Sequence, residues 1–444
     1  MIVQANNAET TTQVIPLFIE KAREGTYFTV PFILPVDVES LTLSYHYERH
    51  HNASVPVGAG NFVGRTQINI IDLGLIAPDG TQLGASGSDK SEFYLSETKA
   101  TPGYKPHALT AGEWQILVGV YKVAPEGVQV TYEIKTTCKT LRLLKGDLHM
   151  HTLASDGVQT AAELAYRALR NGLDFVAITD HNQMVAAEAL PDVAGITLIP
   201  GIEWTHYKGH ANFLGSAQPY DGSFMANTPA EVQARFDAAR QRGATIVINH
   251  PFDEGSPFQF ELGALPFDLL EVWNGPMRES NLKAVGYWQQ LLTAGKKIPI
   301  CGGSDYHRDT PFIFLGGPTT CVYALSCAPS DILSALRAGH AYITFAPNGP
   351  VLEMRAGEAM LGDSVAWDKV KDLTIHLENL LAGDVVRVVT ANTATVVLQA
   401  PASGRFNLIH TMPAPGFARV EVLRAFLPGL PLLPALLSNP VYFN

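Results

Sequence analysis

The sequence predicts an α/β protein in which a parallel sheet or barrel lies between two β-rich parts. Three observations support this fold class. Residues 1–140 show strand patterns and little helical periodicity. From residue 145, apolar strand-like segments alternate with helical segments, which is typical of a parallel sheet and, at this length, of a barrel. From residue 341 the pattern returns to short strands. We therefore expect an N-terminal jelly-roll-like β-sandwich (1–140), a barrel (145–340) and a small C-terminal β-domain (341–444).

The first part contains alternating apolar segments separated by turn residues. The segments "WQILVGVYKV" (114–123) and "VQVTYEIK" (128–135) flank the turn-like residues 124–127, and we predict a β-hairpin there. The segment "QINIIDLGLIAPDG" (67–80) ends in the turn signal Asp79-Gly80. Several such runs within 140 residues favour a β-sandwich.

The middle part contains both kinds of segment. Helices are expected at 160–172, at 228–243 with Thr228 and Glu231 as a capping box, at 278–294, and from Ser330 to Gly339. Buried strands are expected at 173–180, 195–204, 244–251, 267–275 and 298–307. In the last part, "DVVRVVTAN" and "TVVLQAP" are the clearest strands.

Composition excludes several classes of protein. Apolar residues make up 46% of the 444 residues and charged residues 16%, which is typical of a globular protein with a large core. The net charge of −11 and the lack of a basic run argue against a nucleic-acid surface. No apolar run is long enough for a membrane span. The N-terminus lacks signal-peptide features, although a leader already removed would leave the same sequence. The four cysteines are irregularly spaced, so we expect them to be reduced and the protein to be cytoplasmic.

Histidines and carboxylates follow one predicted strand after another in the middle part. Loops after parallel strands converge on one rim, and residues at i and i+2 point the same way. Histidine and carboxylate donors without thiolates suit Zn, Mn or Fe, and nine donors are too many for one ion. We therefore expect two or three divalent ions. The nine residues are His149, His151, Asp156, His181, Glu203, His210, His250, Asp305 and His307.

The charge of such a centre indicates its substrate. Three divalent ions, three ligand carboxylates and a bridging hydroxide together carry about +2, which would attract an anion locally. A metal cluster also polarises a phosphoryl oxygen and supplies hydroxide near neutral pH. We therefore expect a small anionic ester as substrate.

The ordered motifs of the middle part resemble the PHP (polymerase and histidinol phosphatase) superfamily. They are "GDLHMHTLASDG", "AITDHN", "PGIEWT", "GHANFLG", "INHP", "EVWNG" and "GGSDYH", and they span about residues 145–350. The segments "RAGHAYITFAPNGP" and "SNPVYF" resemble its CehA/McbA branch. The resemblance implies a distorted (β/α)7 barrel with a trinuclear metal centre. It implies a first metal on His149, His151 and Asp305, a bridging Glu203, a second metal on His210 and His250, and a third on Asp156, His181 and His307.

Other rim residues have less specific roles. We predict that Asp180 orients a neighbouring group rather than binding a metal. His206 could compete with His210 as a ligand, and we interpret it instead as a rim residue and candidate proton donor. Arg308 and Lys208 are the candidate phosphate-binding cations. Asn182 and Asn274 lie on the same rim, where contact with substrate and stabilisation of a turn are equally good interpretations.

The resulting hypothesis is a metal-dependent phosphoesterase in which a bridging hydroxide attacks a phosphate mono- or diester. One alternative is a carboxyl ester or carbamate hydrolase, which a pocket without arginine or lysine would favour. A second alternative is a glycan- or protein-binding module with an inert barrel. The flanking β-domains could cover the rim, restrict substrate size or form a homo-oligomer.

Overall fold

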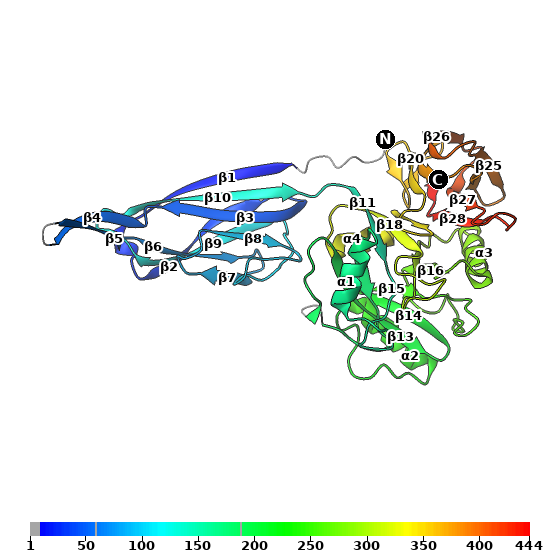
Figure 1. The fold of residues 1–444 in the computed structure, drawn as a ribbon, viewed down its shortest axis with the longest axis horizontal. Coiled ribbons are helices and arrows are strands. Elements are labelled where there is room, and N and C mark those ends of the chain that lie inside the picture. Colours follow the sequence, from blue (N-terminus) through cyan, green and yellow to red (C-terminus); the bar gives the residue numbers. More distant parts are fainter. Residues whose placement is uncertain (1–8, 58–59, 187–188) are drawn as a thin grey trace. The chain divides into compact units, whose positions relative to one another are not determined.

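The computed structural model describes residues 9–57, 60–186 and 189–444, with the side chains of residues 52–65 left aside. The chain forms two compact units that divide between Thr140 and Leu141 (Figure 1). We call residues 9–140 the N-terminal unit and residues 141–444 the C-terminal unit.

The N-terminal unit consists of two four-stranded antiparallel sheets that share one apolar core. Eight strands in two such sheets are also the arrangement of a double-sheet jelly roll. A short 3-10 helix, η1 (Lys21–Arg23), follows β1, and β4 (His50–Val57) pairs with β5 (Gly60–Gln67) as a separate ribbon. In order across each sheet, the first contains β1 (Thr10–Ile19), β10 (Val128–Cys138), β3 (Val38–Tyr47) and β8 (Glu92–Ser96), and the second contains β2 (Thr26–Leu34), β9 (Gly112–Lys122), β6 (Ile70–Ile76) and β7 (Gln82–Ser86).

The expected hairpin at 114–135 is wrong, although both of its strands exist. β9 pairs with β2 and β6, whereas β10 pairs with β1 and β3, so residues 123–127 pass from one sheet to the other. Both strands bury alternate residues in the shared core, for example Trp114 and Ile116 on β9 and Val130 and Tyr132 on β10. Alternation and a turn signal fit a hairpin and a crossover between sheets equally well, because both bury one face of each strand. The turn at Asp79-Gly80 does form a hairpin, between β6 and β7.

The C-terminal unit is built on seven consecutive strands that lie side by side in chain order. All run parallel except β14, which is antiparallel to both of its neighbours. A bridge between Met150 and Tyr306 joins the chain just beyond the first and last of these strands. The strands are β11 (Arg142–Asp147), β12 (Phe175–Ile178), β13 (Thr197–His206), β14 (Gly209–Leu214), β15 (Thr245–Ile248), β16 (Leu269–Asn274) and β17 (Ile300–Gly303).

Among the described residues, α-helices follow three of these seven strands, so the regular (β/α)7 alternation that we expected is present there only in part. They are α1 (Ala161–Arg170), α2 (Pro229–Gln241) and α3 (Glu279–Thr293). The capping box of Thr228 and Glu231 on α2 is confirmed. α4 (Pro329–Ala338) ends at the left-handed Gly339 as expected, but Ser330 is not its cap. Proline is well suited to the first helical position, so α4 begins at Pro329 and Ala328 becomes the N-cap.

The last part of the chain continues the central sheet and does not divide from it as a compact unit. The sheet runs on from β11 through β18 (Thr319–Ala324), β19 (Ala341–Thr344), β28 (Leu433–Ser438), β27 (Gly416–Arg424), β24 (Val385–Val389) and β25 (Ala394–Gln399). A smaller sheet contains β21 (Ala359–Met360), β20 (Val351–Ala356), β23 (Asp372–Leu380) and β26 (Gly404–Thr411), while β22 (Ser364–Val365) pairs with β29 (Val441–Phe443). Patterning predicted short strands from residue 341, of which two segments were named. It did not predict the pairing of β19 with β28, which merges them with the middle part and joins residues 92 to 96 positions apart.

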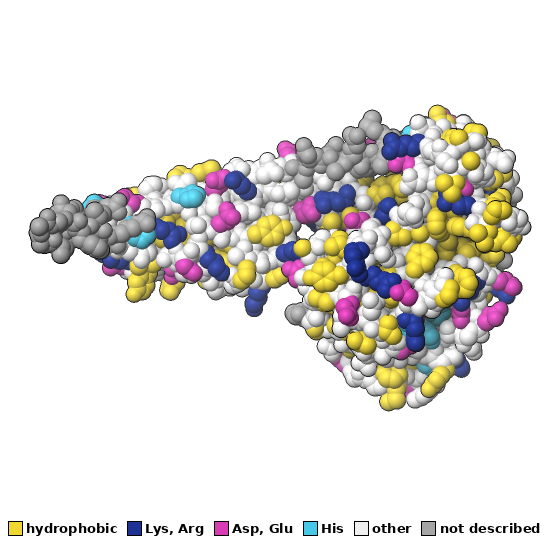
Figure 2. All heavy atoms as spheres, in the orientation of Figure 1, with side chains coloured by type: hydrophobic (Ala, Val, Ile, Leu, Met, Phe, Trp, Pro, Cys, Tyr) yellow, Lys and Arg dark blue, Asp and Glu magenta, His cyan; other side chains and the backbone are white. Residues whose placement is uncertain are grey.

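The surface mixes charge types. On the described part of the face shown in Figure 2, lysine and arginine lie scattered among acidic and hydrophobic side chains, without an extended basic area. Within the described ranges, no helix combines the length and apolar character needed to cross a membrane. The four cysteines are free thiols.

Candidate metal centre

The structure brings all nine predicted ligand residues to one end of the seven strands. His149 and His151 follow β11, His181 follows β12, and Glu203 and His210 lie on the paired strands β13 and β14. His250 follows β15, and Asp305 and His307 follow β17. Two main-chain hydrogen bonds, from His151 to Tyr306 and from Asp305 to His149, hold the ends of the first and last strands together. The donors therefore converge because the strands that carry them are neighbours in a curved sheet.

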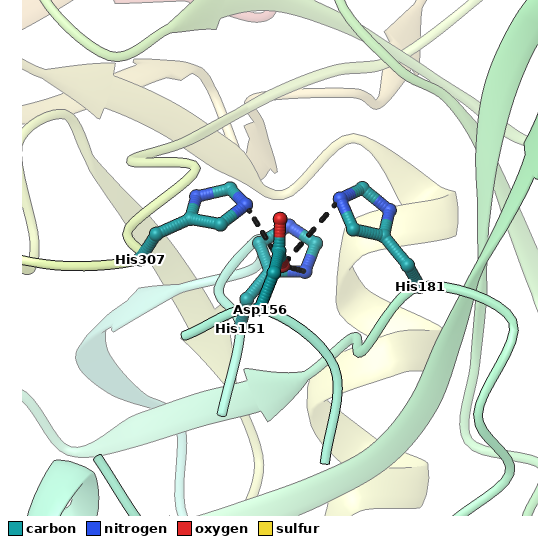
Figure 3. Close-up of side chains that lie close together, drawn as sticks. All are labelled: His151, Asp156, His181 and His307. Atoms are coloured by element: carbon teal, nitrogen blue, oxygen red, sulfur yellow. Dashed lines mark ion pairs between the residues drawn. The ribbon is translucent and has the colours of Figure 1, made fainter. Parts of the chain in front are cut away.

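One group of donors surrounds Asp156 (Figure 3). Its Oδ1 atom lies 3.2 Å from His307 Nε2, 3.7 Å from His181 Nε2 and 4.0 Å from His151 Nδ1. His307 donates its other ring nitrogen to the carbonyl of Asp305, 2.9 Å away, which turns Nε2 towards Asp156. Three imidazoles and one carboxylate facing one point are a donor set for a divalent ion.

A second group is centred on Glu203, which is fully buried. Its carboxylate lies within 3.5 Å of ring nitrogens of five histidines. Burial by itself would raise the pKa of Glu203, but the positive charge of His149 and the close approach of His149, His181 and His210 hold that pKa well below its usual value. Glu203 is therefore a carboxylate at the geometric centre of the cluster. The five histidines are His149, His151, His181, His210 and His250.

Asp305 links His149 and His151. Its Oδ1 atom lies 3.1 Å from His151 Nε2 and 3.4 Å from His149 Nε2. Burial would raise the pKa of Asp305, but His149 and His151 lower it far below its usual value. Conversely, burial would lower the pKa of His149, but Asp305, Glu271 and Glu203 raise it well above its usual value.

Glu271 is a buried carboxylate of this cluster to which we assigned no role from sequence. It lies on β16 and accepts a hydrogen bond from His149 Nδ1 at 3.0 Å and from the main-chain amide of His250 at 2.9 Å. Holding Nδ1 in this way fixes the ring and leaves Nε2 free as a ligand. The signal was present in "FDLLEVWNG", where one acidic residue interrupts a run of buried apolar residues.

The donor atoms at the centre fit divalent ions. Four buried polar atoms of the cluster have no hydrogen-bond partner in the described structure: His149 Nε2, His151 Nδ1, His250 Nδ1 and Glu203 Oε2. Unpaired buried polar atoms are costly, so native proteins keep few of them. Four within one cluster of histidines and carboxylates indicate groups that a metal ion satisfies when it binds.

The backbone at the cluster adopts conformations that side chains usually avoid. His250 and Asp305 have φ angles of 24° and 53°, in a region that L residues with side chains enter rarely. Gly303 allows the close approach that this geometry requires, because a Cβ there would lie 2.3 Å from His149 Cβ. The strained backbone marks the end of the strands as a site held in place by its surroundings.

Asp180 is buried and contacts the loop that carries Asp156. Its oxygens accept hydrogen bonds from the amide and hydroxyl of Thr152, at 2.7 and 2.8 Å, and from Ser155 Oγ at 2.8 Å. Asp180 forms no ion pair with the nine donors in the described structure. Its position fits the predicted orienting role, which remains a prediction.

His206 lies outside the cluster. Its Nε2 donates to the carbonyl of Ala226 at 2.9 Å, and its Nδ1 accepts from the amide of Lys208 at 3.0 Å. The ring also stacks on Trp204, with centroids 5.3 Å apart. With both nitrogens engaged by the main chain, this arrangement gives no support to the predicted role as proton donor.

A pocket of about 290 Å³ opens beside the cluster, and Arg278 lies in its wall. Arg278 donates to Asn274 Oδ1 at 3.2 Å and lies 3.7 Å from Asp253. Arg308 and Lys208, the cations predicted from sequence, are exposed and do not line this pocket. Arg278 was missed because it lies 27 residues before Asp305 and no motif marks it. The pocket lining includes His250, Asp253, Ser256, Asn274, Gly275, Arg278, Ser304, Asp305, His307 and Ile313.

Comparison with known proteins finds a family-model match within the C-terminal unit. The PHP domain model matches residues 147–248, which carry His149, His151, Asp156, His181, Glu203 and His210. The chain therefore contains a PHP domain.

Two relatives are similar to part of this chain. The 5'-3' exoribonuclease Rnm of Salmonella typhimurium is 35% identical over 100 residues, which are 20% of this chain and 34% of that protein. The 3',5'-nucleoside bisphosphate phosphatase of Chromobacterium violaceum is 31% identical over 107 residues, 22% of this chain and 37% of that protein. This chain thus spans about a third of the length of these relatives.

Among solved structures, a two-domain protein of Bacteroides vulgatus that contains a predicted PHP-like metal-dependent phosphoesterase is 18% identical. The match covers 64% of this chain and 90% of that one, and its TM-score of 0.38 is too low to bear on function.

Proposed function

We propose that the C-terminal unit is a metal-dependent phosphoesterase that hydrolyses a small phosphate mono- or diester. The PHP domain, the two phosphate-ester-cleaving relatives and the donor cluster support this proposal. His149, His151 and Asp305 would hold one divalent ion, His210 and His250 a second, and Asp156, His181 and His307 a third, with Glu203 between the first two. Zn, Mn or Fe bound there would act as Lewis acids and make water nucleophilic near neutral pH.

Arg278 is the residue that favours a phosphate ester over a carboxyl ester as substrate. It lies in the same pocket as Asp305 and His307, and its guanidinium is held by Asn274. A guanidinium matches the charged oxygens of a phosphoryl group, whereas the carbonyl of a carboxyl ester carries no charge to pair with it. Arg278 would bind the phosphoryl oxygens and hold the ester against the metal-binding end of the strands.

Other side chains would position this machinery. Glu271 holds the ring of His149, and Asp180 holds the loop of Asp156 through Thr152 and Ser155. Such supporting hydrogen bonds fix the orientation of metal-binding side chains and raise their affinity for the metal.

The segments 337–350 and 438–443 that resemble CehA/McbA proteins favour a place in that branch, which is also associated with cleavage of carboxyl esters and carbamates. A carboxyl ester or carbamate is therefore the alternative substrate. The Asp253 carboxylate, 3.7 Å from Arg278, favours this alternative because it offsets part of the guanidinium charge.

A hydrolysis panel distinguishes the two substrates. The protein with added Mn or Zn would be assayed on a phosphodiester, a phosphomonoester and a carboxyl ester of the same chromogenic phenol. His151→Ala serves as the blank. Arg278→Met should raise KM for the phosphate ester by about tenfold or more and leave any carboxyl-ester activity unchanged.

Arg308→Met is the matched control, since Arg308 is an exposed arginine outside the pocket. It should leave all rates unchanged. Turnover of the carboxyl ester alone would contradict the proposal and support the alternative hydrolase. Equal effects of Arg278→Met and Arg308→Met would remove Arg278 from the substrate site.

A further inference from the structure

A second pocket, of about 130 Å³, lies at the opposite end of the strands from the metal-binding residues. Pro299, which lines it, precedes β17, whereas Asp305 follows that strand. Arg337, another lining residue, donates to the hydroxyl of Thr245 at the start of β15, whereas His250 follows that strand. This pocket is therefore separate from the proposed active site. It is lined by Lys297, Pro299, Arg337, Ala338, Gly339, Gly362, Asn439, Pro440 and Tyr442.

Two cationic side chains line this pocket, and each donates a hydrogen bond to a neutral group. Lys297 Nζ donates to Ser364 Oγ at 2.8 Å and lies 4.6 Å from the centroid of the Tyr442 ring. Arg337 is held by Thr245 Oγ1. Neither forms an ion pair with a carboxylate of the described residues, and the lining contains no acidic side chain. The side chains are thus positioned while their charge is not neutralised.

The acidic residue that follows the lining residue Gly362 in sequence is already engaged. Asp363, next to the lining residue Gly362, pairs with His340 Nε2 at 2.9 Å and accepts from the amide of Met360. The whole chain carries a net charge of −11. A small pocket lined by two cations without acidic partners is therefore locally positive on a protein that is negative overall.

Main-chain atoms form part of the wall and fix its shape. A Cβ atom on Gly362, which has a φ angle of 86°, would lie 1.9 Å from the carbonyl of Ala338. Asn439 is fully buried and bonds the main chain of Ile300 and Ala341. The pocket is thus a hollow shaped in part by main-chain atoms and lined by two cationic side chains.

We propose that this pocket binds a small oxyanion, of which inorganic phosphate is the test case. Like charges that face one hollow repel each other, and an anion between them removes the repulsion and accepts hydrogen bonds from both. The volume accommodates a phosphate with a few waters, since one water takes about 30 Å³. It is below the range of about 300–1,000 Å³ typical of pockets for larger ligands, which disfavours a nucleotide.

The test is calorimetric titration of the metal-free protein with inorganic phosphate at constant ionic strength. Removal of metal by a chelator prevents phosphate from binding metal ions at the other end of the strands. Lys297→Met and Arg337→Met should each weaken binding by about tenfold or more, since each removes a charged donor. Lys297→Arg keeps the charge and should bind within a few-fold of the original, which separates loss of the site from misfolding.

Two matched controls complete the test. Lys296→Met removes the adjacent exposed lysine, which does not line the pocket, and should leave the affinity unchanged. Arg278→Met removes the arginine of the proposed active site and should also leave it unchanged. Equal weakening by Lys296→Met, loss only in Arg278→Met, or lack of saturable binding would each overturn the proposal. Adenosine monophosphate binding through Lys297 and Arg337 with equal affinity would overturn the choice of a small free anion. None of these outcomes depends on the hydrolytic activity.

Discussion

The two units of this chain bury very different side chains. The described part of the N-terminal unit buries Asn69, Ser96 and Thr136, and each has a hydrogen-bond partner. It buries no carboxylate or imidazole among those residues. Its buried polar atoms without a partner are a nitrogen of Arg49 and the hydroxyl of Tyr132, which do not share a cluster of histidines and carboxylates. The C-terminal unit buries several of both around Glu203, and four of their polar atoms lack partners. Both units have large apolar cores, so the contrast lies in what is placed at the strand ends. Buried ionisable groups lower stability unless they are paired, and their concentration at one place indicates a function.

The sharpest test of this contrast is Glu203→Gln. It removes the charge that five histidines surround, and we expect kcat/KM to fall by about 10³-fold, a size seen when a main electrostatic group of a site is lost. Metal content should fall with it, because an amide is a weaker ligand than a carboxylate. Both can be followed by elemental analysis and by the ester assay. Full metal content with normal activity would show that Glu203 is not a ligand.

The opposite test acts on the apolar core of the N-terminal unit. Leu43→Ala on β3 truncates a fully buried side chain and should lower the free energy of unfolding of that unit by about 3 kcal/mol. The measurement is hydrogen exchange of the β3 amides in the full chain. Activity should not change, since all the donor residues belong to the other unit. A loss of activity at a temperature where the variant is folded would contradict the conclusion that activity depends on the C-terminal unit alone.

Glu271→Gln tests whether a carboxylate that hydrogen-bonds a donor residue strengthens metal binding by that residue. It keeps the shape but loses the charge that holds His149 Nδ1, and we expect metal affinity to weaken by up to about 100-fold. A metal titration with a competing chelator measures this. Leu270→Val on the same strand is the control for packing and should leave the affinity unchanged, because Leu270 belongs to the apolar core.

Asp180→Asn should have the smallest effect. The amide keeps one oxygen for Thr152 and Ser155, so the loop of Asp156 stays near its position and activity should fall by about tenfold. The measurement is kcat/KM for the ester that the panel selects. A loss as large as that of Glu203→Gln would indicate that Asp180 binds a metal directly.

Particular residues show how much of the site could be predicted from the sequence. His149 and His151, two positions apart after a buried strand, were predictable as a pair because alternate residues of an extended chain point the same way. Their convergence with Asp305 was inferred because parallel strands end on one rim. Glu271 and Arg278 were not assigned, because their roles depend on which strands are neighbours and on the start of α3. The hairpin error at residues 114–135 has the same origin, since the pattern shows which face is buried but not the partner strand.

The sequence by itself indicated a divalent-metal site, because histidines and carboxylates follow one predicted strand after another. It also determined most of the strands and helices, because local periodicity reflects burial. The tertiary structure alone decided which carboxylate holds which histidine, which arginine lies beside the donor cluster, and which two cationic side chains line one pocket at the opposite end of the strands. Those features depend on distances between side chains far apart in the chain, and such distances are set only when the strands pair and the helices pack.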